Sequence, residues 1–156
     1  MASNRHLGRI IVLQTLYELT FREECGDKGV SVLDIMERNI SRYKATLDDI
    51  QFVKQFTDGV AKDASKLDEL LQPLAPEWPL QQIARIDHIL LRMGAYELTN
   101  HADVPPKVAI NETVELAKSF GGDNSSKFVN GVLGTLLRKI DPNAPQAEAA
   151  KKEDSK

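Results

Sequence analysis

The chain has 156 residues, a formal net charge of −3 at pH 7, and 42% hydrophobic against 28% charged residues, which is the composition of an ordinary globular domain. No apolar run is long enough to span a bilayer, and the first residues lack the apolar stretch and cleavage site of a secretory leader. Cys25 is the single cysteine, which excludes an internal disulfide and a cysteine zinc site. We therefore expect a cytoplasmic protein with no membrane segment.

Helical periodicity runs through most of the chain, and the period-two alternation of strands is absent. The first segment is apolar on most sides, which predicts a central helix packed by several neighbours. The third has apolar residues in three- and four-residue steps, with a break near 63–65 left open. The expected helices cover 5–23, 30–44, 47–71, 80–99, 106–120 and 125–140. The prediction is an all-α fold built from two small helical bundles.

Prolines and glycines give further expectations about packing. A proline run over 73–79 is the best candidate for an internal boundary, since proline is not tolerated inside a helix. We expect one domain over 1–140, with subdomains of about 1–75 and 76–140, and a disordered tail over 141–156. Glycine inside a helix costs about 1 kcal/mol against alanine, so Gly94, Gly131 and Gly134 are predicted to mark close helix crossings.

Basic residues gather toward the two ends of the chain. Residues 1–22 carry three arginines against one acid, and residues 104–140 carry five basic against three acidic residues. The segment between them, 23–103, has an acidic excess. This distribution could provide one face for a polyanion and another for a basic partner. It is equally common on solvated surfaces, and charge alone leaves both interpretations open.

Sequence motifs for catalysis are missing. The chain contains no phosphate loop, dinucleotide fingerprint, HExxH or nucleophile elbow, and its three histidines lack the spacing of metal ligands. Cys25 follows two glutamates, whose negative charge disfavours a reactive thiolate. We therefore expect neither an enzyme nor a bound metal or cofactor.

The stretch SFGGDNSSKFVNG, residues 119–131, joins the last two expected helices. Gly121 and Gly122 suit a left-handed helix C-cap, and Asn124 is the first choice for the N-cap that follows, ahead of Ser125 or Ser126. Free amides at such a helix start favour phosphate. The turn is therefore a candidate anion site.

Two residues after this turn are unusual for a helix start. Lys127 places a cation where the helix dipole makes positive charge unfavourable, which a polyanion site would tolerate. Phe128 lies at the margin of the apolar stripe. It is either an edge of the core, which the pattern favours, or a platform for an unstacked base.

Three segments resemble the NusB family of bacterial transcription antitermination factors. DVPPKVAINETVELAKSFGGDNSSKFVNGVL, residues 103–133, resembles the family signature. ARIDHILLRMGAYEL, residues 84–98, resembles its next most typical segment, and RIIVLQTLYEL, residues 9–19, resembles its first helix. The resemblance implies about seven helices in two subdomains, with no catalysis and no cofactor.

The resemblance also implies partners. These are the boxA element of ribosomal RNA leader transcripts, the small-subunit ribosomal protein NusE, and elongating RNA polymerase with other Nus factors. The complex suppresses premature termination and supports ribosomal RNA maturation. The RNA-binding residues implied by position are Arg5, Arg9, Tyr17, Lys118, Asn124, Ser125, Lys127 and Phe128. Asp87, helped by Arg92, falls on the helix that faces NusE in the family.

The expected site brings together the basic starts of the first and last helices as one cradle for an RNA strand. Family members often carry more arginines before the first helix, so RNA binding by the isolated chain is expected to be weak. Two alternatives stay open: a helical protein-interaction module, and an accessory domain of an RNA methyltransferase, disfavoured because no cofactor-binding domain follows. The sequence does not choose between a monomer and a homodimer.

Overall fold

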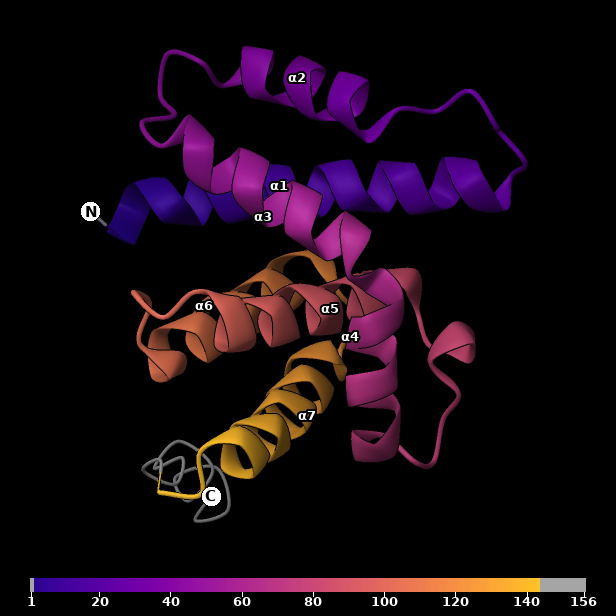
Figure 1. The fold of residues 1–156 in the computed structure, drawn as a ribbon, viewed down its shortest axis with the longest axis vertical. Coiled ribbons are helices and arrows are strands. Elements are labelled where there is room, and N and C mark those ends of the chain that lie inside the picture. The colour runs from indigo at the N-terminus through magenta and orange to yellow at the C-terminus, as the bar shows by residue number, and fades with distance from the viewer. Residues whose placement is uncertain (1, 144–156) are drawn as a thin grey trace.

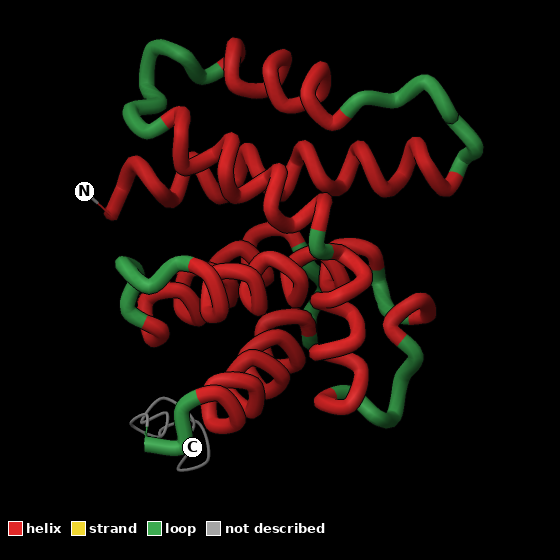
Figure 2. The backbone as a smooth tube through the Cα atoms, viewed as in Figure 1, coloured by secondary structure: helices red, strands yellow, loops and turns green. Residues whose placement is uncertain are grey.

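The computed structural model describes residues 2–143, with side chains from residue 5 onward. This part of the chain contains seven α-helices, two short 3-10 turns and no strand (Figures 1 and 2). The all-α prediction is therefore confirmed. Most of the expected tail, residues 144–156, lies outside the described residues.

The helices follow the predicted order closely. They are α1 (Ala2–Glu24), α2 (Val32–Arg42), α3 (Ile50–Lys62), α4 (Ala64–Leu71), α5 (Arg85–Asn100), α6 (Pro106–Phe120) and α7 (Ser125–Ile140). The segment expected over 47–71 is divided at Asp63, where α3 ends and α4 begins. The start of α5 is later than predicted, because Leu80–Gln82 forms a 3-10 turn and Ile83 is extended.

The helices form two layers (Figure 1). In one layer α1, α2 and α3 pack against each other, and in the other α5, α6 and α7 do so, with α4 packed on α5. The change of layer therefore falls at Asp63, between α3 and α4, and not near residue 75. The proline run lies in an ordered connection instead. The side-chain Nε2 of Gln72 donates to the backbone carbonyl of Trp78 at 3.0 Å, and its Oε1 accepts from the backbone N–H of Leu80 at 3.0 Å.

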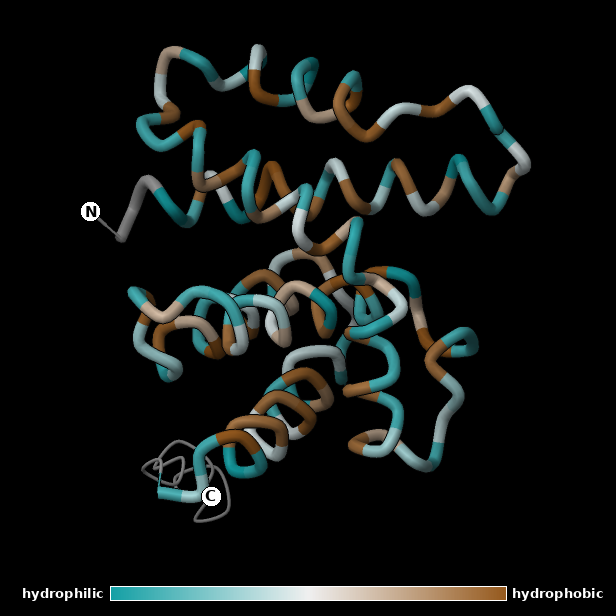
Figure 3. Tube along the Cα trace, viewed as in Figure 1, coloured by the Kyte–Doolittle hydropathy of each residue, from teal (hydrophilic) through white to brown (hydrophobic). Residues whose placement is uncertain are grey.

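The core lies between the layers, and apolar residues line the facing sides of the helices (Figure 3). Helix α1 contacts both α3 and α5, and its residues Ile11, Val12, Leu13 and Leu16 are buried. Because α1 packs against helices of both layers, it has the central position that the sequence predicts. Helix α3 is capped by Asp49, whose carboxylate accepts the Phe52 amide at 3.0 Å.

One of the three predicted close crossings is present. A Cβ atom on Gly94 of α5 would overlap the side chain of Leu133 on α7, so the absence of a side chain allows the two helices to approach. The predictions for Gly131 and Gly134 are wrong. A Cβ on Gly131 would meet nothing within 4 Å, and one on Gly134 would meet only the flexible end of Arg138 at 3.7 Å.

Candidate nucleic-acid interface

The α6–α7 turn is held by close packing and not by a left-handed glycine. Gly121 has φ −94° and ψ −174°, which is extended backbone, so the predicted left-handed cap is wrong. A Cβ there would lie 2.6 Å from Ser125 Cβ and 2.7 Å from the Ala117 carbonyl oxygen, which explains the glycine. In the described part of the chain, Gly26 after α1 is the glycine with positive φ, at 84°.

Two polar residues at the start of α7 differ in their contacts: Ser125 is hydrogen-bonded within the turn, and Asn124 is exposed to solvent. Ser125 is 5% exposed, and its hydroxyl accepts the Gly122 amide at 2.9 Å. Asn124 occupies the N-cap position, is exposed, and makes no capping hydrogen bond with its side chain, contrary to prediction. The amide of Asn124 is therefore available for other contacts, whereas the hydroxyl of Ser125 already has a partner.

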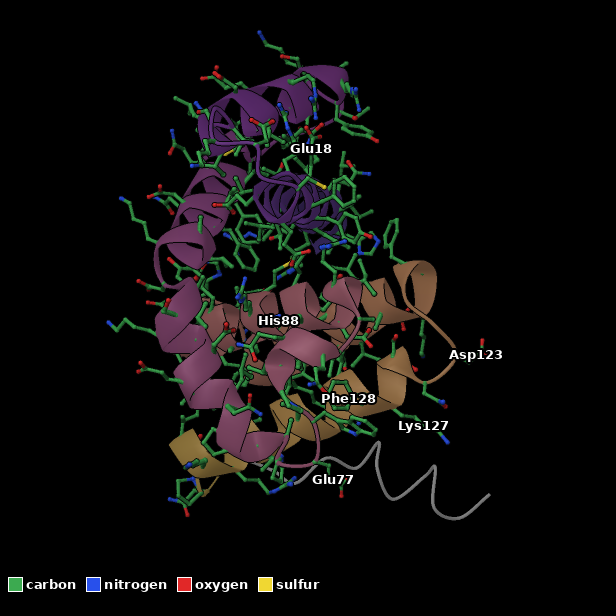
Figure 4. All side chains as sticks on the ribbon, turned by 90° about the vertical axis from the view of Figure 1, so that its right-hand side faces the viewer. Glu18, Glu77, His88, Asp123, Lys127 and Phe128 are labelled. Atoms are coloured by element: carbon green, nitrogen blue, oxygen red, sulfur yellow. The ribbon has the colours of Figure 1, made fainter. Side chains whose placement is uncertain are left out.

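Lys127 and Asp123 project outward from this turn, whereas Phe128 lies back against the helices (Figure 4). Lys127 is exposed, and no hydrogen bond or ion pair involves it among the described residues. Lys118, in the last turn of α6, is exposed and lies 3.5 Å from a carboxylate oxygen of Glu115. Phe128 is half-buried and packs on the core, as the favoured interpretation predicts.

The guanidinium of Arg9 is buried, and one of its edges donates two hydrogen bonds to a carboxylate. Arg9 is 2% exposed, and its Nε and Nη2 atoms donate to the two oxygens of Glu97 on α5 at 2.8 Å and 2.7 Å. Burial raises the pKa of Glu97, but the interactions with Arg9 and His101 outweigh it and hold the pKa below its usual range. The prediction that Arg9 contacts phosphate does not fit this geometry. The residue joins the two layers instead.

Arg5 lies at the other end of α6 from the α6–α7 turn. Its guanidinium donates to Asp103, just before α6, at 3.2 Å, lies 3.8 Å from Asp49, and stacks over the Phe52 ring at 4.7 Å. Helix α6 has 15 residues, so its two ends are about 20 Å apart. The expected convergence of the starts of α1 and α7 is therefore wrong, since Arg5 and Lys127 lie at opposite ends of this helix.

The second half of α1, and not its start, meets the end of α6. An open groove of ≈ 510 Å³ separates the two, with Tyr17 on α1 and Phe120 on α6 among the residues that line it. These rings are 39% and 44% exposed. Arg85, at the start of α5, holds its guanidinium carbon 5.4 Å from the Tyr17 ring centre and 5.2 Å from that of Phe21.

Sequence reasoning included Tyr17 in the site but missed Phe21, Arg85 and Phe120. Phe21 and Phe120 continue the apolar periodicity of their helices, and periodicity alone does not distinguish them from core residues. Both are the last large apolar residue before a helix end, where the partner helix no longer covers the stripe. That position is the signal that could have identified them as exposed.

The two residues predicted to face a protein partner are both on α5. Arg92 donates to the carboxylate of Asp68 on α4 at 2.9 Å and 2.7 Å, and His88 lies 2.8 Å from the same carboxylate. Arg92 therefore holds α4 against α5. Asp87 is half-buried in the first turn of α5, and its Oδ1 atom is buried without a hydrogen-bond partner.

This ion-pair cluster predicts a specific loss of stability in acid. Burial raises the pKa of Asp68, but the hydrogen bonds from Arg92 and His88 outweigh it and lower the pKa from 3.8 to about 2. A lowered folded-state pKa stabilises the fold above pH 3.8, and the contribution disappears as the pH falls toward 2. After allowance for solvent screening of a partly exposed group, we expect about 1–2 kcal/mol.

Urea unfolding of the wild type and Asp68→Asn over this pH range measures the effect. The difference in unfolding free energy between them should be largest near neutral pH and should be lost as the pH falls through about 2, where the Asp68 carboxyl of the folded protein becomes protonated. A difference that is independent of pH would contradict the assignment.

Two packed helical layers, with a solvent-facing lysine at a helix start and an open aromatic groove beside it, define a small helical binding protein. The chain belongs to the NusB family, whose family model matches residues 6–138. It is a transcription antitermination factor and not an enzyme. Among the described residues, none of the helices combines the length and apolar character that crossing a bilayer requires.

Related sequences and structures agree with this membership. The transcription antitermination protein NusB of Dehalococcoides mccartyi (strain CBDB1) is 38% identical over 148 residues, covering 95% of this chain and 99% of the relative. That of Chloroflexus aggregans is 37% identical over 141 residues, covering 89% and 90%. The structure of NusB from T. maritima superimposes with a TM-score of 0.77 at 28% identity, covering 96% of each chain.

A further solved structure shares the fold at lower identity. The crystal structure of the antitermination factors NusB and NusE in complex with dsRNA contains a chain with a TM-score of 0.76 and 18% identity, covering 89% of this chain and 99% of that one. At this identity the comparison shows the fold alone.

Proposed function

We propose that this chain binds the boxA element of ribosomal RNA leader transcripts together with NusE, and that the complex acts on elongating RNA polymerase with other Nus factors. The RNA strand lies across the α6–α7 turn. Lys127 and Lys118 contact its phosphates, and the Asn124 side chain supplies a hydrogen bond. The activity requires no reaction and takes place in the cytoplasm, where nascent transcripts are made.

The observation that carries this proposal is the environment of Lys127. A lysine in the first turn of a helix opposes the helix dipole, and this one has no carboxylate within ion-pair distance among the described residues. Such a cation contributes little to folding, and it is available to neutralise a phosphate and release its counterions. The amide of Asn124 beside it adds no negative charge that would repel the strand.

The contact with NusE is proposed on α5. Asp87 retains its predicted role, because a buried carboxylate oxygen without a hydrogen-bond partner is a group that a basic protein could satisfy. Arg92 is no longer assigned to this surface, since its Nε and Nη2 atoms donate to the carboxylate of Asp68. Pairing of two copies of this chain is the competing use of the exposed groove between α1 and α6.

Filter binding of boxA RNA to the chain with NusE, across a salt series, tests the phosphate contact. Lys127→Ala is expected to weaken binding and to reduce the slope of log affinity against log salt by about one unit, as one lost phosphate contact requires. Lys66→Ala, which removes an exposed lysine on α4, serves as the matched control and should change neither quantity. An unchanged slope for Lys127→Ala would remove the turn from the RNA site.

A further inference from the structure

We propose that His101, at the end of α5, is a proton-dependent clasp between the two helical layers. In mild acid its ring gains a proton, pairs with the buried carboxylate of Glu97 and tightens the contact between α5 and α3. The inference goes beyond the proposed function and does not depend on it, because His101 precedes α6 whereas the α6–α7 turn follows it.

The imidazole ring of His101 belongs to a cluster of rings that connects the two layers. Its centre lies 5.6 Å from that of Phe52 and 5.1 Å from that of Phe56, both on α3. Tyr96 of α5 lies 5.4 Å from it and stacks on Phe56. The two helices are close here, because a Cβ atom on Gly59 of α3 would overlap the Tyr96 hydroxyl. The rings of Phe52, Phe56 and Tyr96 thus form an aromatic box for the histidine.

One nitrogen of the His101 ring is buried without a partner. Its Nδ1 atom makes no hydrogen bond among the described residues, although a carboxylate oxygen of Glu97 lies 3.9 Å away. The two side chains are 14% and 1% exposed, so water has little access to either. A buried polar atom without a partner is costly. A protonated ring carries a donor on both nitrogens, and a movement of about 1 Å would bring Nδ1 into a charge-assisted hydrogen bond with Glu97.

The charges beside the aromatic box are one cation short of balance. Two guanidinium groups lie over the Phe52 ring, at 4.7 Å and 5.2 Å from its centre, and both pair with carboxylates. Within the described part of the chain these ion pairs contain two cations and three anions, and a protonated His101 would balance them. Burial raises the pKa of Tyr96, so that ring stays neutral. The charged groups are Arg5 and Arg9 of α1, Glu97 of α5, Asp103 before α6 and Asp49 before α3.

The interactions of the charged ring outweigh the cost of burying it. Burial and the nearby Arg9 guanidinium disfavour a proton on His101. The Glu97 carboxylate favours it, and the rings of the aromatic box lie within the distance of about 6 Å at which an aromatic face attracts a cation. Although burial raises the pKa of Glu97, Arg9 and His101 hold it below its usual range, so this carboxylate stays ionised in mild acid.

The stability of the fold should therefore depend on the charge of His101. A folded state that binds a proton more tightly than the unfolded chain is stabilised as the pH falls. The contribution of His101 should be complete in mild acid and should be lost as the pH rises past neutrality, since imidazole titrates in this range. The contribution of Asp68 is lost only as the pH falls toward 2, so the two effects are separable.

Urea unfolding of the full chain between about pH 5.5 and pH 8 tests the clasp. His101→Gln removes the titrating ring and keeps a neutral polar side chain. The ratio of the variant's unfolding equilibrium constant to that of the wild type is expected to be about 3- to 10-fold larger at the lower pH than at the higher. Tyr96→Phe keeps the aromatic box and His101, so it is the matched control and should follow the wild-type pH profile.

Two further measurements make the test specific. The double variant Arg9→Met with Glu97→Leu keeps the histidine but removes its carboxylate, so the gain in mild acid should be lost. The ring resonances of His101 in the wild type, which need no variant, should show a proton bound at higher pH in the folded chain than in the urea-unfolded chain. A ratio of unfolding constants that is constant with pH, or smaller at the lower pH, would overturn the proposal. A ring that stays neutral in the folded chain at the lower pH would overturn it as well.

Discussion

Replacement of Glu97 by glutamine is expected to lower the free energy of unfolding by about 3–5 kcal/mol, because it leaves the buried Arg9 guanidinium without its counter-charge. Both side chains are almost completely buried, at 3% and 1% exposure, so water cannot compensate for the lost carboxylate. The neutral amide keeps the shape, but it removes the charge and replaces one of the two acceptor oxygens with an NH2 group that cannot accept from Arg9. Urea unfolding followed by circular dichroism measures the loss.

The double variant Arg9→Met with Glu97→Leu is the matched control. Removing both charges leaves no buried ion unpaired, so its stability should be close to that of the wild type or above it. It also separates the two roles considered for Arg9. If Arg9 only joins the layers, the double variant should bind boxA RNA as the wild type does, whereas a large loss of affinity with an intact fold would restore Arg9 to the RNA site.

Gly94→Val is expected to destabilise the protein by about 2–3 kcal/mol, through overpacking at the crossing of α5 and α7. The new side chain would run into Leu133, which is fully buried in the core. Thermal unfolding compares this variant with Gly131→Val. Gly131 is also within a helix, but nothing lies within 4 Å of its Cβ position, so that variant should stay within about 0.5 kcal/mol of the wild type. Equal effects at the two positions would contradict the crossing.

The sequence predicted the elements of this fold more accurately than the way they pack. The helices over 106–120 and 125–140 match α6 and α7, because apolar periodicity, proline and the polar turn mark the ends of both. The layer boundary was placed at the proline run, since local rules see a break in helicity but not which helix packs on which. Asp63 carries no such signal, and only the packing of α4 on α5 shows where the layer changes.

The site was predicted in part, for a similar reason. Lys127 stands out in the sequence because its charge opposes the helix dipole, and that local argument needs no tertiary information. The burial of Arg9 could not be seen, because its partner Glu97 is 88 residues away and neither residue is unusual within its own helix. The groove was missed because its aromatic residues come from different helices, whose relative placement the sequence does not give.

The most direct test of the account is the footprint of boxA RNA on the chain, measured from backbone amide resonances with NusE present. The largest shifts are expected over residues 118–128 and 13–18, which are the α6–α7 turn and the part of α1 that lines the groove. Residues 5–9 should change little. Shifts concentrated at residues 5–9, with 118–128 unperturbed, would place the RNA at the start of α1 and contradict the central claim.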